Sequence, residues 1–524
     1  MKKNNWSSYI CGWIVFIMIC ISSIYTVLKT GNNVVIDSAL LSLMVFWLLR
    51  CKERNILYAD VFARASLSAI TSIASYMVAI KILKIDISVY EYCTIIPLFV
   101  ASAVAGVEFF DAISASYFNL ESYSFPQQEP RIRLLAELCN TKDGKKNPTI
   151  KSFFATCVVS QCFKGIGIYA RNFNLCNIIT ITPSFLTSAV GYFIGWKTYL
   201  IMLFGAVYSF IIYIVEDSAS YTMHIQNPYI YSVIVGFSLA QGVVVVFEFF
   251  KNCKGRKKGT VSETNIIKRG ILVLGIYIAV CCLIVSISKS SMFSMPFWLP
   301  ILIIPFSITL SVSTMKSIAE TGYWISVLDD LLPIIIMIIF SGIKLETIII
   351  LVSALTMFEM CGIYFVINKY VGKRFNVSSI EIKKVSLISV VLCTITGLLI
   401  IKTLINTNSL MTDDLPAPLA NAFAAQLKII YSGIVNNVFP DNINVIVIIC
   451  AFLCGLLMTK INISPMIILA GVMLPFGTMI LMGIGVVISI LAKRKEYISK
   501  IMSGVALGES LVLSVNTIIG TYWS

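Results

Sequence analysis

The stretch MKSIAETGYWISVLDDLLP, residues 315–333, is a polar interruption near the middle of a chain that is otherwise almost continuously apolar. Glu320, Thr321 and Gly322 lie between two segments that are each long enough to cross a bilayer. Irregular backbone at membrane depth is tolerated only where it is buried in protein or lines a wet cavity. The stretch therefore predicts a break between two spans, either a discontinuous helix beside a cavity or an ordinary surface loop.

The composition places the chain in a lipid bilayer. Its 524 residues are 58% hydrophobic and 13% charged, with a mean hydropathy of +0.89, whereas soluble domains carry about 25% charged residues. Apolar runs of about 20 residues, enough for one transmembrane helix, recur from Tyr9 to Tyr522. We therefore predict an all-α, polytopic integral membrane protein with about 14–17 transmembrane helices. The first run is too long for a signal peptide and is expected to be a retained helix.

Run length and flanking charges predict the individual spans. They fall at about 9–28, 33–50, 61–83, 92–116, 152–170, 173–195, 197–215, 228–250, 270–288, 296–315, 330–343, 346–367, 383–404, 416–435, 443–459, 464–491 and 501–521. Pro126 and Pro130 predict a turn followed by a short amphipathic helix in the longest hydrophilic stretch. Pro475 is expected to kink its span.

The net charge of +14 records topology rather than nucleic-acid binding, because Lys and Arg in a membrane protein mark the cytoplasmic loops. Basic residues cluster in five regions, 50–54, 131–151, 251–269, 369–384 and 493–500. The loops at 216–227 and 406–415 contain neither Lys nor Arg. A multi-pass protein of the cell membrane is predicted, with a cytoplasmic N-terminus and no nucleic-acid partner. A homo-oligomer is left open.

Metal and cofactor chemistry is not expected. The 15 cysteines are scattered through apolar segments without a zinc-like spacing, and His224 is the one histidine in the sequence. Proton transfer inside the membrane must therefore rest on carboxylates. P-loop, GxSxG and HExxH patterns are missing from the sequence, so we expect a protein that is not an enzyme.

An internal repeat is predicted from three ordered pairs of segments. ITPSFLTSAVGYFIGW from Ile181 resembles ISPMIILAGVMLPFG from Ile463, SFPQQEPRIRLLAEL from Ser124 resembles DLPAPLANAFAAQL from Asp414, and VIVGFSLAQG from Val233 resembles IMSGVALGES from Ile501. The alternative is a shared vocabulary of Gly and Pro in packed helices. Two halves, residues 1–290 with the leading helices and 291–524, are characteristic of secondary transporters. Whether they run parallel or inverted stays open.

These same segments, together with the AETGYW stretch, resemble the oligopeptide transporter family, in its prokaryotic branch related to the yellow-stripe-like metal-chelate carriers. The resemblance covers most of the chain from Glu53 onward. It implies a many-helix, internally repeated carrier that imports peptides or related small molecules with protons. The family's polar mid-chain segment falls on Glu320, Thr321 and Gly322, and its glycine-flanked acidic position falls on Glu509. The chain departs from the plant branch in having no long acidic N-terminal extension, which affects the substrate more than the fold.

The candidate site residues are polar groups inside predicted spans. Proton coupling requires a group that is neutral in one state and ionised in another, and a buried carboxylate meets that requirement. The candidates for substrate binding or proton coupling are Glu108, Asp111, Lys164, Gln241, Glu320, Thr321, Gly322, Glu359 and Glu509. One carboxylate is expected to titrate, while others bind a positive substrate group or pair with Lys164 or Arg64. For each of them the alternative is a structural ion pair, a helix-end position or an interhelical hydrogen bond.

Small residues and prolines are expected to serve packing and bending. Glycines spaced four apart let two helices approach closely, and prolines interrupt helices. The candidates for packing or hinge positions are Pro183, Gly191, Gly195, Pro465, Gly471, Pro475, Gly504 and Gly508.

The sequence thus predicts a secondary active transporter, with proton-coupled import of oligopeptides or peptide-like metal chelates by alternating access. A flippase-type exporter of lipid-linked sugars or polysaccharides is the alternative, and it requires a large cationic cavity. An integral-membrane enzyme would need catalytic residues clustered at one depth. A channel would need a polar-lined pore.

Overall fold

A computed structural model describes most of the chain. The described residues are 5–30, 53–85, 87–116, 123–139, 148–165, 173–175, 179–181, 183–215, 227–255, 261–287, 295–324, 332–333, 336, 342–405, 417, 420–421, 423–425, 427–428, 431, 444–493 and 495–522. The predicted spans at 33–50, 330–343 and 416–435 lie wholly or mostly outside them, as do residues 117–122 and the histidine.

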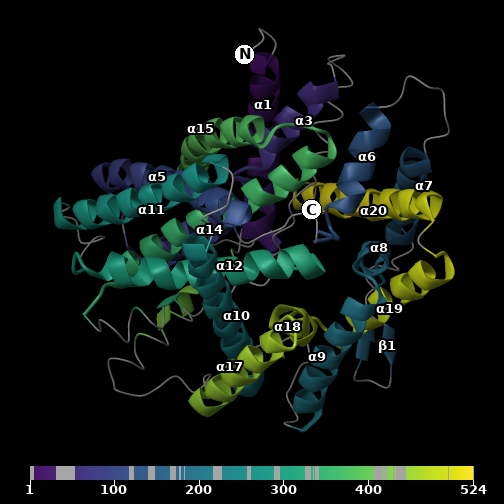
Figure 1. The fold of residues 1–524 in the computed structure, drawn as a ribbon. Helices are drawn as coiled ribbons and strands as arrows, with labels where there is room; N and C mark the ends of the chain where they lie inside the picture. The colour runs from purple at the N-terminus through teal and green to yellow at the C-terminus, as the bar shows by residue number, and fades with distance from the viewer. Residues whose placement is uncertain are drawn as a thin grey trace.

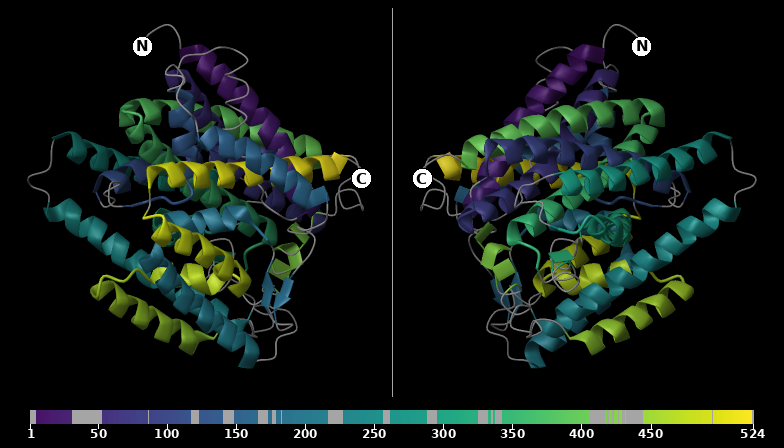
Figure 2. Two further views of the ribbon diagram at one scale, coloured as in Figure 1. Left: turned by 90° about the vertical axis from the view of Figure 1, so that its right-hand side faces the viewer. Right: turned by 90° about the vertical axis from the view of Figure 1, so that its left-hand side faces the viewer.

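The described regular structure is helical apart from one short hairpin (Figures 1 and 2). The helices of the first half are α1 (Asn5–Thr30), α3 (Glu53–Arg64), α4 (Leu67–Ile82), α5 (Val89–Ser116), α6 (Glu129–Cys139), α7 (Pro148–Gly165), α8 (Phe185–Ile194), α9 (Trp196–Val215), α10 (Pro228–Gly255) and α11 (Val261–Ile287). Those of the second half are α12 (Leu299–Thr321), α14 (Leu345–Arg374), α15 (Ser379–Ile405), α17 (Val445–Lys460), α18 (Pro465–Met473), α19 (Phe476–Leu491) and α20 (Glu496–Tyr522). The hairpin pairs β1 (Phe173–Leu175) antiparallel to β2 (Ile179–Ile181).

The helices confirm the prediction of a polytopic, α-helical membrane protein. Among the described residues, nine helices are long and apolar enough to cross a bilayer, or ten if α18 and α19 form one broken span. A bilayer core leaves backbone polar groups no water to bind, so spanning segments must satisfy their own hydrogen bonds as helices do. The chain is therefore an integral membrane protein with many spans.

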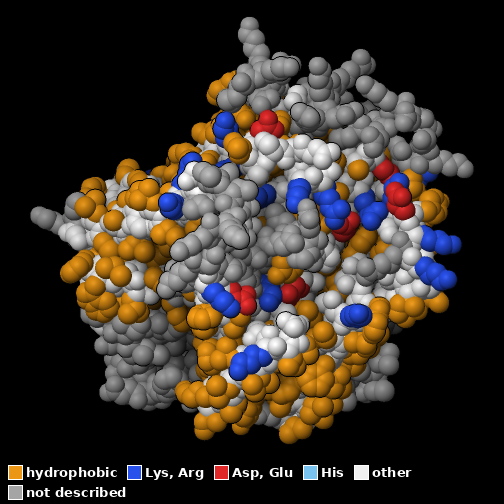
Figure 3. All heavy atoms as spheres, viewed as in Figure 1, with side chains coloured by type: hydrophobic (Ala, Val, Ile, Leu, Met, Phe, Trp, Pro, Cys, Tyr) orange, Lys and Arg blue, Asp and Glu red, His pale blue; other side chains and the backbone are white. Residues whose placement is uncertain are grey.

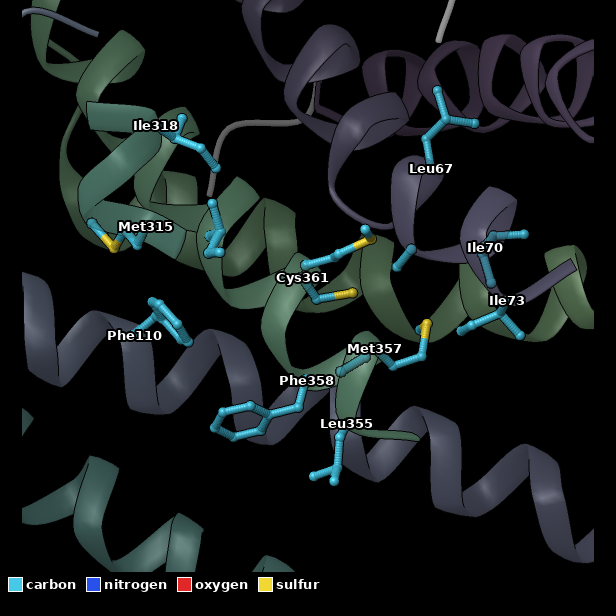
Figure 4. Packing of buried hydrophobic residues seen from close by; sticks show 14 of the residues in the cluster. Leu67, Ile70, Ile73, Phe110, Met315, Ile318, Leu355, Met357, Phe358 and Cys361 are labelled. Carbon is cyan, nitrogen blue, oxygen red and sulfur yellow. The ribbon is translucent and has the colours of Figure 1, made fainter. Parts of the chain in front are cut away.

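Helix α14 is the most deeply buried of the candidate membrane spans. Within its most apolar stretch of 18 residues, 94% is buried inside the protein. A helix that is apolar on all sides is stable only when it is surrounded. Figure 4 shows Leu355, Met357, Phe358 and Cys361 of α14 packed among side chains of α4, α5 and α12. This core includes α5 and α14, which carry the buried acids Glu108, Asp111 and Glu359.

One predicted span, 173–195, differs from the structure. Residues 173–195 form the hairpin and the short helix α8 rather than one span. Pro183 interrupts any helix that would run through it, because proline lacks a backbone N–H and its ring clashes with the preceding turn. Gly195 ends α8 with φ 89°, a conformation that few residues besides glycine adopt. The predicted span 61–83 falls almost entirely within one candidate span, Asn55–Ile82, in which a turn at Ala65 and Ser66 separates α3 from α4.

The polar stretch in the middle of the chain begins as helix, which corrects the predicted break. Helix α12 runs through Glu320 and Thr321, and Gly322 caps it in the left-handed conformation with φ 82°. The Gly322 N–H donates to Ile318 O at 3.0 Å. Glu320 is thus held in the last turn of a helix instead of in a loop, because the break falls at the first residue that readily adopts positive φ.

Two bent helix pairs, α8–α9 and α18–α19, pack against each other. The bend between α18 and α19 at Pro475 is 119°. Helix α8 lies along α19, and α9 lies along α18. A side chain at Gly191 would run into the backbone of Met482, and one at Gly471 into the backbone of Met202. The two contacts are reciprocal, because 471 − 191 and 482 − 202 both equal 280.

Two further helix packings also meet at glycines, but without a constant offset. Helix α10 lies along α17, at the bottom of Figure 1, and α20 lies along α7. Gly236 of α10 approaches Ile448 of α17, and Gly504 of α20 approaches Thr149 of α7. The two glycines differ by 268 (504 − 236), and their two partners differ by 299 (448 − 149). The close approach follows from the missing side chain at each glycine.

Candidate functional site

Three of the buried carboxylates are held in two ion-pair networks. Glu108 and Asp111, each 3% exposed on α5, share Lys383 of α15 at 2.7 Å and 2.8 Å. Arg269 of α11 adds a 2.7 Å contact to Glu108, and Lys369 of α14 adds a 2.8 Å contact to Asp111. Their spacing of three places both acids on one helix face, as predicted. Two acids and three bases from four helices thus form one ion-pair network.

A second network was not anticipated from the sequence. Buried Asp60 of α3 accepts from Arg131 Nε of α6 at 2.8 Å and from Arg64 Nε at 3.2 Å. Arg131 also donates to Gln128 Oε1 at 3.2 Å and to Asn368 Oδ1 at 3.3 Å. Arg64 therefore pairs with Asp60 rather than with one of the candidate carboxylates. The sequence contained one signal, Arg131 directly after the SFPQQEP motif, but its partner lies on a helix 71 residues earlier.

Two further candidates lie away from any described cavity. Lys164 is exposed in the last turn of α7, so it is not the buried partner that its place in a predicted span suggested. Glu359 is buried in the middle of α14, on the helix that forms the centre of the core. Neither residue lines the cavity described below.

Glu509 caps a helix on the opposite half of the chain. It lies on α20, fully buried, and its Oε2 accepts from Ser184 Oγ at 2.9 Å and from Leu186 N. Ser184 is the N-cap of α8 and also accepts from Thr187 N at 3.2 Å. A carboxylate is favoured there because the first N–H groups of a helix lack partners within the helix and carry partial positive charge.

The glycines around Glu509 bring α20 against α7. A side chain at Gly504 would collide with Thr149 O, and one at Gly508 would lie 2.7 Å from Phe153 O and 2.9 Å from Thr156 Cβ. This approach places Glu509 beside the start of α8. The small residues thus fix the position of the carboxylate.

The remaining carboxylate candidate, Glu320, lies at the end of α12 beside Gln241 of α10. Lys316, one turn earlier on α12, is 3.9 Å from Glu320 Oε1 and donates to Gln241 Oε1 at 3.2 Å. Lys316 therefore joins two of the residues chosen from sequence. Sequence reasoning missed Lys316 itself, although its spacing of four from Glu320 places both on one helix face.

Glu320 and Lys316 border a cavity of about 880 Å³. Glu320, Lys316 and Ser464 lie in its wall, α17 contributes Leu453 and Lys460, and α10 contributes apolar side chains and exposed Glu248. The volume is in the range of small-molecule sites. Figure 3 shows, on the face of Figure 1, charged side chains gathered across the middle and hydrophobic side chains toward the left and lower edges.

Two polar atoms of the cavity wall, and one of Gln241 next to Lys316, have no hydrogen-bond partner among the described residues. They are Gln241 Nε2, Glu320 Oε2 and Ser464 Oγ. Ser464, 8% exposed, lies beside the Glu320 carboxylate and precedes α18, but the two side chains do not complete a hydrogen bond. Buried polar atoms are normally paired, so each of these three atoms can still take part in a further hydrogen bond.

Residues of the SFPQQEP motif pack against the C-terminal end of α12. Phe125 N donates to Ala319 O at 3.1 Å, and Gln127 packs against Gly322, where a side chain would lie 2.9 Å from Gln127 Cγ. Burial raises the pKa of the nearby Tyr123 phenol, and the Glu320 and Glu248 carboxylates raise it further. Tyr123 thus stays protonated and neutral beside Glu320. Two motifs from different halves of the sequence meet here.

Thr321 supports the geometry of this helix end. Its hydroxyl donates to Ser317 O at 2.8 Å and accepts from Tyr323 N at 3.1 Å. Thr321 and Gly322 therefore shape the turn that follows Glu320 and do not line the cavity themselves. No group of three metal-ligating His, Cys, Asp or Glu residues occurs among the residues that the structure describes.

Gln241 and Glu509 occupy corresponding positions on their helices. They differ by 268, as do Gly236 and Gly504. Glu509 accepts from Ser184, the cap of α8, whereas Gln241 accepts from Lys316, which lines the same cavity as Ser464, the residue before α18. The two serines differ by 280. The signal was present in the paired segments, but the sequence could not tell which helix start each residue faces. No protein-family model matches the chain. No curated protein matches it either.

Proposed function

We propose that this protein is a secondary active transporter that imports oligopeptides or peptide-like metal chelates with protons, by alternating access between residues 1–290 and 291–524. The single observation that carries the proposal is the cavity of about 880 Å³ at the start of α18, with unpartnered polar atoms on Glu320 and Ser464 in its wall. A carrier needs such a site beside broken helices, whose free backbone groups bind ligands.

The reciprocal contacts of the bent helix pairs support the two-repeat part of the proposal. Contacts related by a constant offset of 280 are expected when two similar units pack face to face about a twofold axis. In such an arrangement a small tilt of one unit against the other opens one side of the interface and closes the other. Transport would then take place where the units meet.

The charge of the cavity favours a substrate that carries both signs. Its described wall includes two acids, Glu248 and Glu320, and two bases, Lys316 and Lys460. An exporter of polyanions requires a mainly cationic cavity. The balanced wall instead suits a zwitterion such as a peptide, in agreement with the substrate class that the sequence resemblance implies.

Glu320 is the carboxylate best placed for proton coupling. Glu108 and Asp111 contact lysines at 2.7–2.8 Å, and Glu509 accepts charge-stabilising hydrogen bonds. Glu320 has only Lys316 at 3.9 Å, and its Oε2 has no partner among the described groups. A mostly buried carboxylate with so few partners changes its protonation most readily. The N-terminus is proposed to be cytoplasmic, in the cell membrane.

Uptake by reconstituted vesicles tests the function. The full chain is placed in proteoliposomes with an imposed inward proton gradient, and accumulation of labelled trialanine and of a labelled iron chelate is followed. Gradient-dependent accumulation of either is expected. If neither accumulates above protein-free vesicles, the proposed function is wrong.

The variant Glu320→Gln tests the residue. Its side chain keeps the shape of Glu320 and cannot carry the proton, so gradient-driven accumulation is expected to be lost while exchange of substrate across the membrane persists. Glu496→Gln is the matched control, because Glu496 is 75% exposed at the start of α20 and pairs with Lys500 one turn away. Equal accumulation by both variants would remove Glu320 from the mechanism.

A further inference from the structure

The two broken helices begin in chemically different ways. At the start of α8, the Glu509 carboxylate accepts from the cap hydroxyl of Ser184 and from Leu186 N in the first turn. At the start of α18, the cap hydroxyl of Ser464 has no such partner among the described residues. Ile467 N donates instead to Ser464 O at 3.2 Å, which leaves the hydroxyl available.

The position that corresponds to Glu509 is held by an amide. Gln241 is completely buried, and its Oε1 accepts from Lys316 Nζ at 3.2 Å. Its Nε2, a donor, has no partner in the described part of the chain. Where α20 brings a carboxylate to a helix start, α10 therefore brings donors. The nearest carboxylate on this side is Glu320 of α12, which lies beside Ser464 but does not complete a hydrogen bond to its hydroxyl.

We infer that the start of α18 is a binding site for a carboxylate group of the ligand, held by Ser464 Oγ, Gln241 Nε2 and Lys316 Nζ as Glu509 is held at α8. Amide, hydroxyl and ammonium donors at a helix N-terminus are the groups that bind carboxylates. The cavity beside them supplies the space for the rest of the ligand. This assignment deepens the proposed function and rests on it for its role in transport.

The site also couples carboxylate binding to a proton. Glu320 is 16% exposed and takes Lys316 as its cation at 3.9 Å. The other charged or titratable groups around it are Glu248 of α10, Lys460 of α17 and Tyr123 before α6, of which Glu248 and Lys460 are exposed. Lys316, 14% exposed, is thus the one mostly buried cation among the described neighbours. A second carboxylate beside it is stable only when Glu320 takes up a proton, since adjacent like charges disfavour each other's ionisation.

Thermal stability of the purified full chain in detergent, without a gradient, tests the site directly. Trialanine, trialanine amide and succinate are added in turn, and apparent affinity is taken from the rise in melting temperature with concentration. Trialanine is expected to bind about tenfold or more tightly than its amide, because the amide lacks the charge that the donors select. Equal effects of trialanine and its amide, or no effect of either carboxylate, would overturn the inference.

Three variants sharpen the test. Gln241→Glu supplies a carboxylate from the protein, and it is expected to weaken trialanine binding about tenfold or more. Gln161→Glu adds the same charge at an exposed position of α7 and should leave binding unchanged. Trialanine affinity in the unmodified chain should fall about tenfold per pH unit above the Glu320 pKa, whereas Glu320→Gln should bind without that pH dependence. Persistence of the pH dependence in Glu320→Gln would overturn the coupling.

The results separate this site from the proposed function. Carboxylate binding without gradient-driven uptake would leave the site standing and remove the transporter proposal. Binding of succinate but not of trialanine would support the carboxylate site and remove peptides as the substrate. Uptake of trialanine that is equal to uptake of its amide would support the transporter and overturn the carboxylate site.

Discussion

The starts of α8 and α18 are alike in backbone and different in chemistry. Each begins after an extended serine, each is followed by a bend, and each is approached by a glycine-packed helix from elsewhere in the chain. At α8 the approaching residue is Glu509, and the helix start is filled by the protein's own carboxylate. At α18 it is Gln241, and the start opens on a cavity.

The comparison shows how two similar backbone arrangements can differ in whether the helix start is occupied by the protein's own side chain. Helix packing depends on small residues that are present on both sides, at Gly236 and Gly504. Binding depends on one side chain, which is an acceptor at α20 and an amide at α10. A single substitution at a corresponding position therefore decides whether a helix start is internal structure or is available to a ligand.

The largest effect is expected for Glu509→Ala. The change removes an acceptor of two hydrogen bonds and leaves the start of α8 without that acceptor, which should lower the free energy of unfolding by about 3 kcal/mol. Thermal unfolding in detergent measures it. Glu509→Gln, which keeps the shape and one acceptor oxygen, should lose less. If Glu509→Ala melts with the unmodified protein, the start of α8 is not closed by this residue.

The next effect tests whether the two bent pairs are equivalent. Gly191→Ala and Gly471→Ala each force a methyl group against the backbone of the opposite helix pair. Overpacking of this kind should destabilise each variant by about 2 kcal/mol. Melting temperatures of the two should fall by similar amounts, because their contacts are reciprocal. Gly275→Ala, at a position with open space, serves as control. Unequal losses at Gly191 and Gly471 would break the equivalence.

A smaller effect separates the two cap serines. Ser184→Ala removes hydrogen bonds to Thr187 N and Glu509 and should lower the free energy of unfolding by about 1 kcal/mol. Ser464→Ala removes a buried hydroxyl without a described partner, so its change should stay under about 0.5 kcal/mol. Thermal unfolding of the two variants, measured in parallel without added ligand, compares these losses. A larger loss at Ser464 would mean that its hydroxyl is already bonded.

The smallest effect is expected at Lys164. Its side chain is exposed at the end of α7 and lines neither helix start. Lys164→Ala should therefore change the free energy of unfolding by no more than about 0.5 kcal/mol and leave uptake unchanged. A loss of gradient-driven uptake in this variant would restore the role in coupling that its predicted position suggested.

The sequence allowed much of the site to be named in advance. Glu320, Gln241 and Glu509 were selected because polar groups inside apolar helices are costly and usually functional. Their arrangement was not visible. The sequence placed Glu320 in a break, whereas it lies in the last turn of α12, and it left Lys316 out although Lys316 links Glu320 to Gln241.

The partners of the buried charges could not be read from the chain. Glu108 and Asp111 are three residues apart, and that local relation was predicted correctly from helical geometry. Their cations come from α11, α14 and α15, between 161 and 275 residues away. A charge is neutralised by whichever helix packs beside it, and packing depends on shape along the whole interface rather than on local sequence.

The sequence by itself determined that the chain spans a membrane many times, because the length and polarity of a transmembrane helix are local properties fixed by bilayer thickness. It also supplied the glycines whose spacing lets helices approach. Only the tertiary structure decided that Glu509 fills one helix start while Gln241 leaves the other facing a cavity. That outcome depends on how helices from distant parts of the sequence pack together, and this packing is established only when the protein folds.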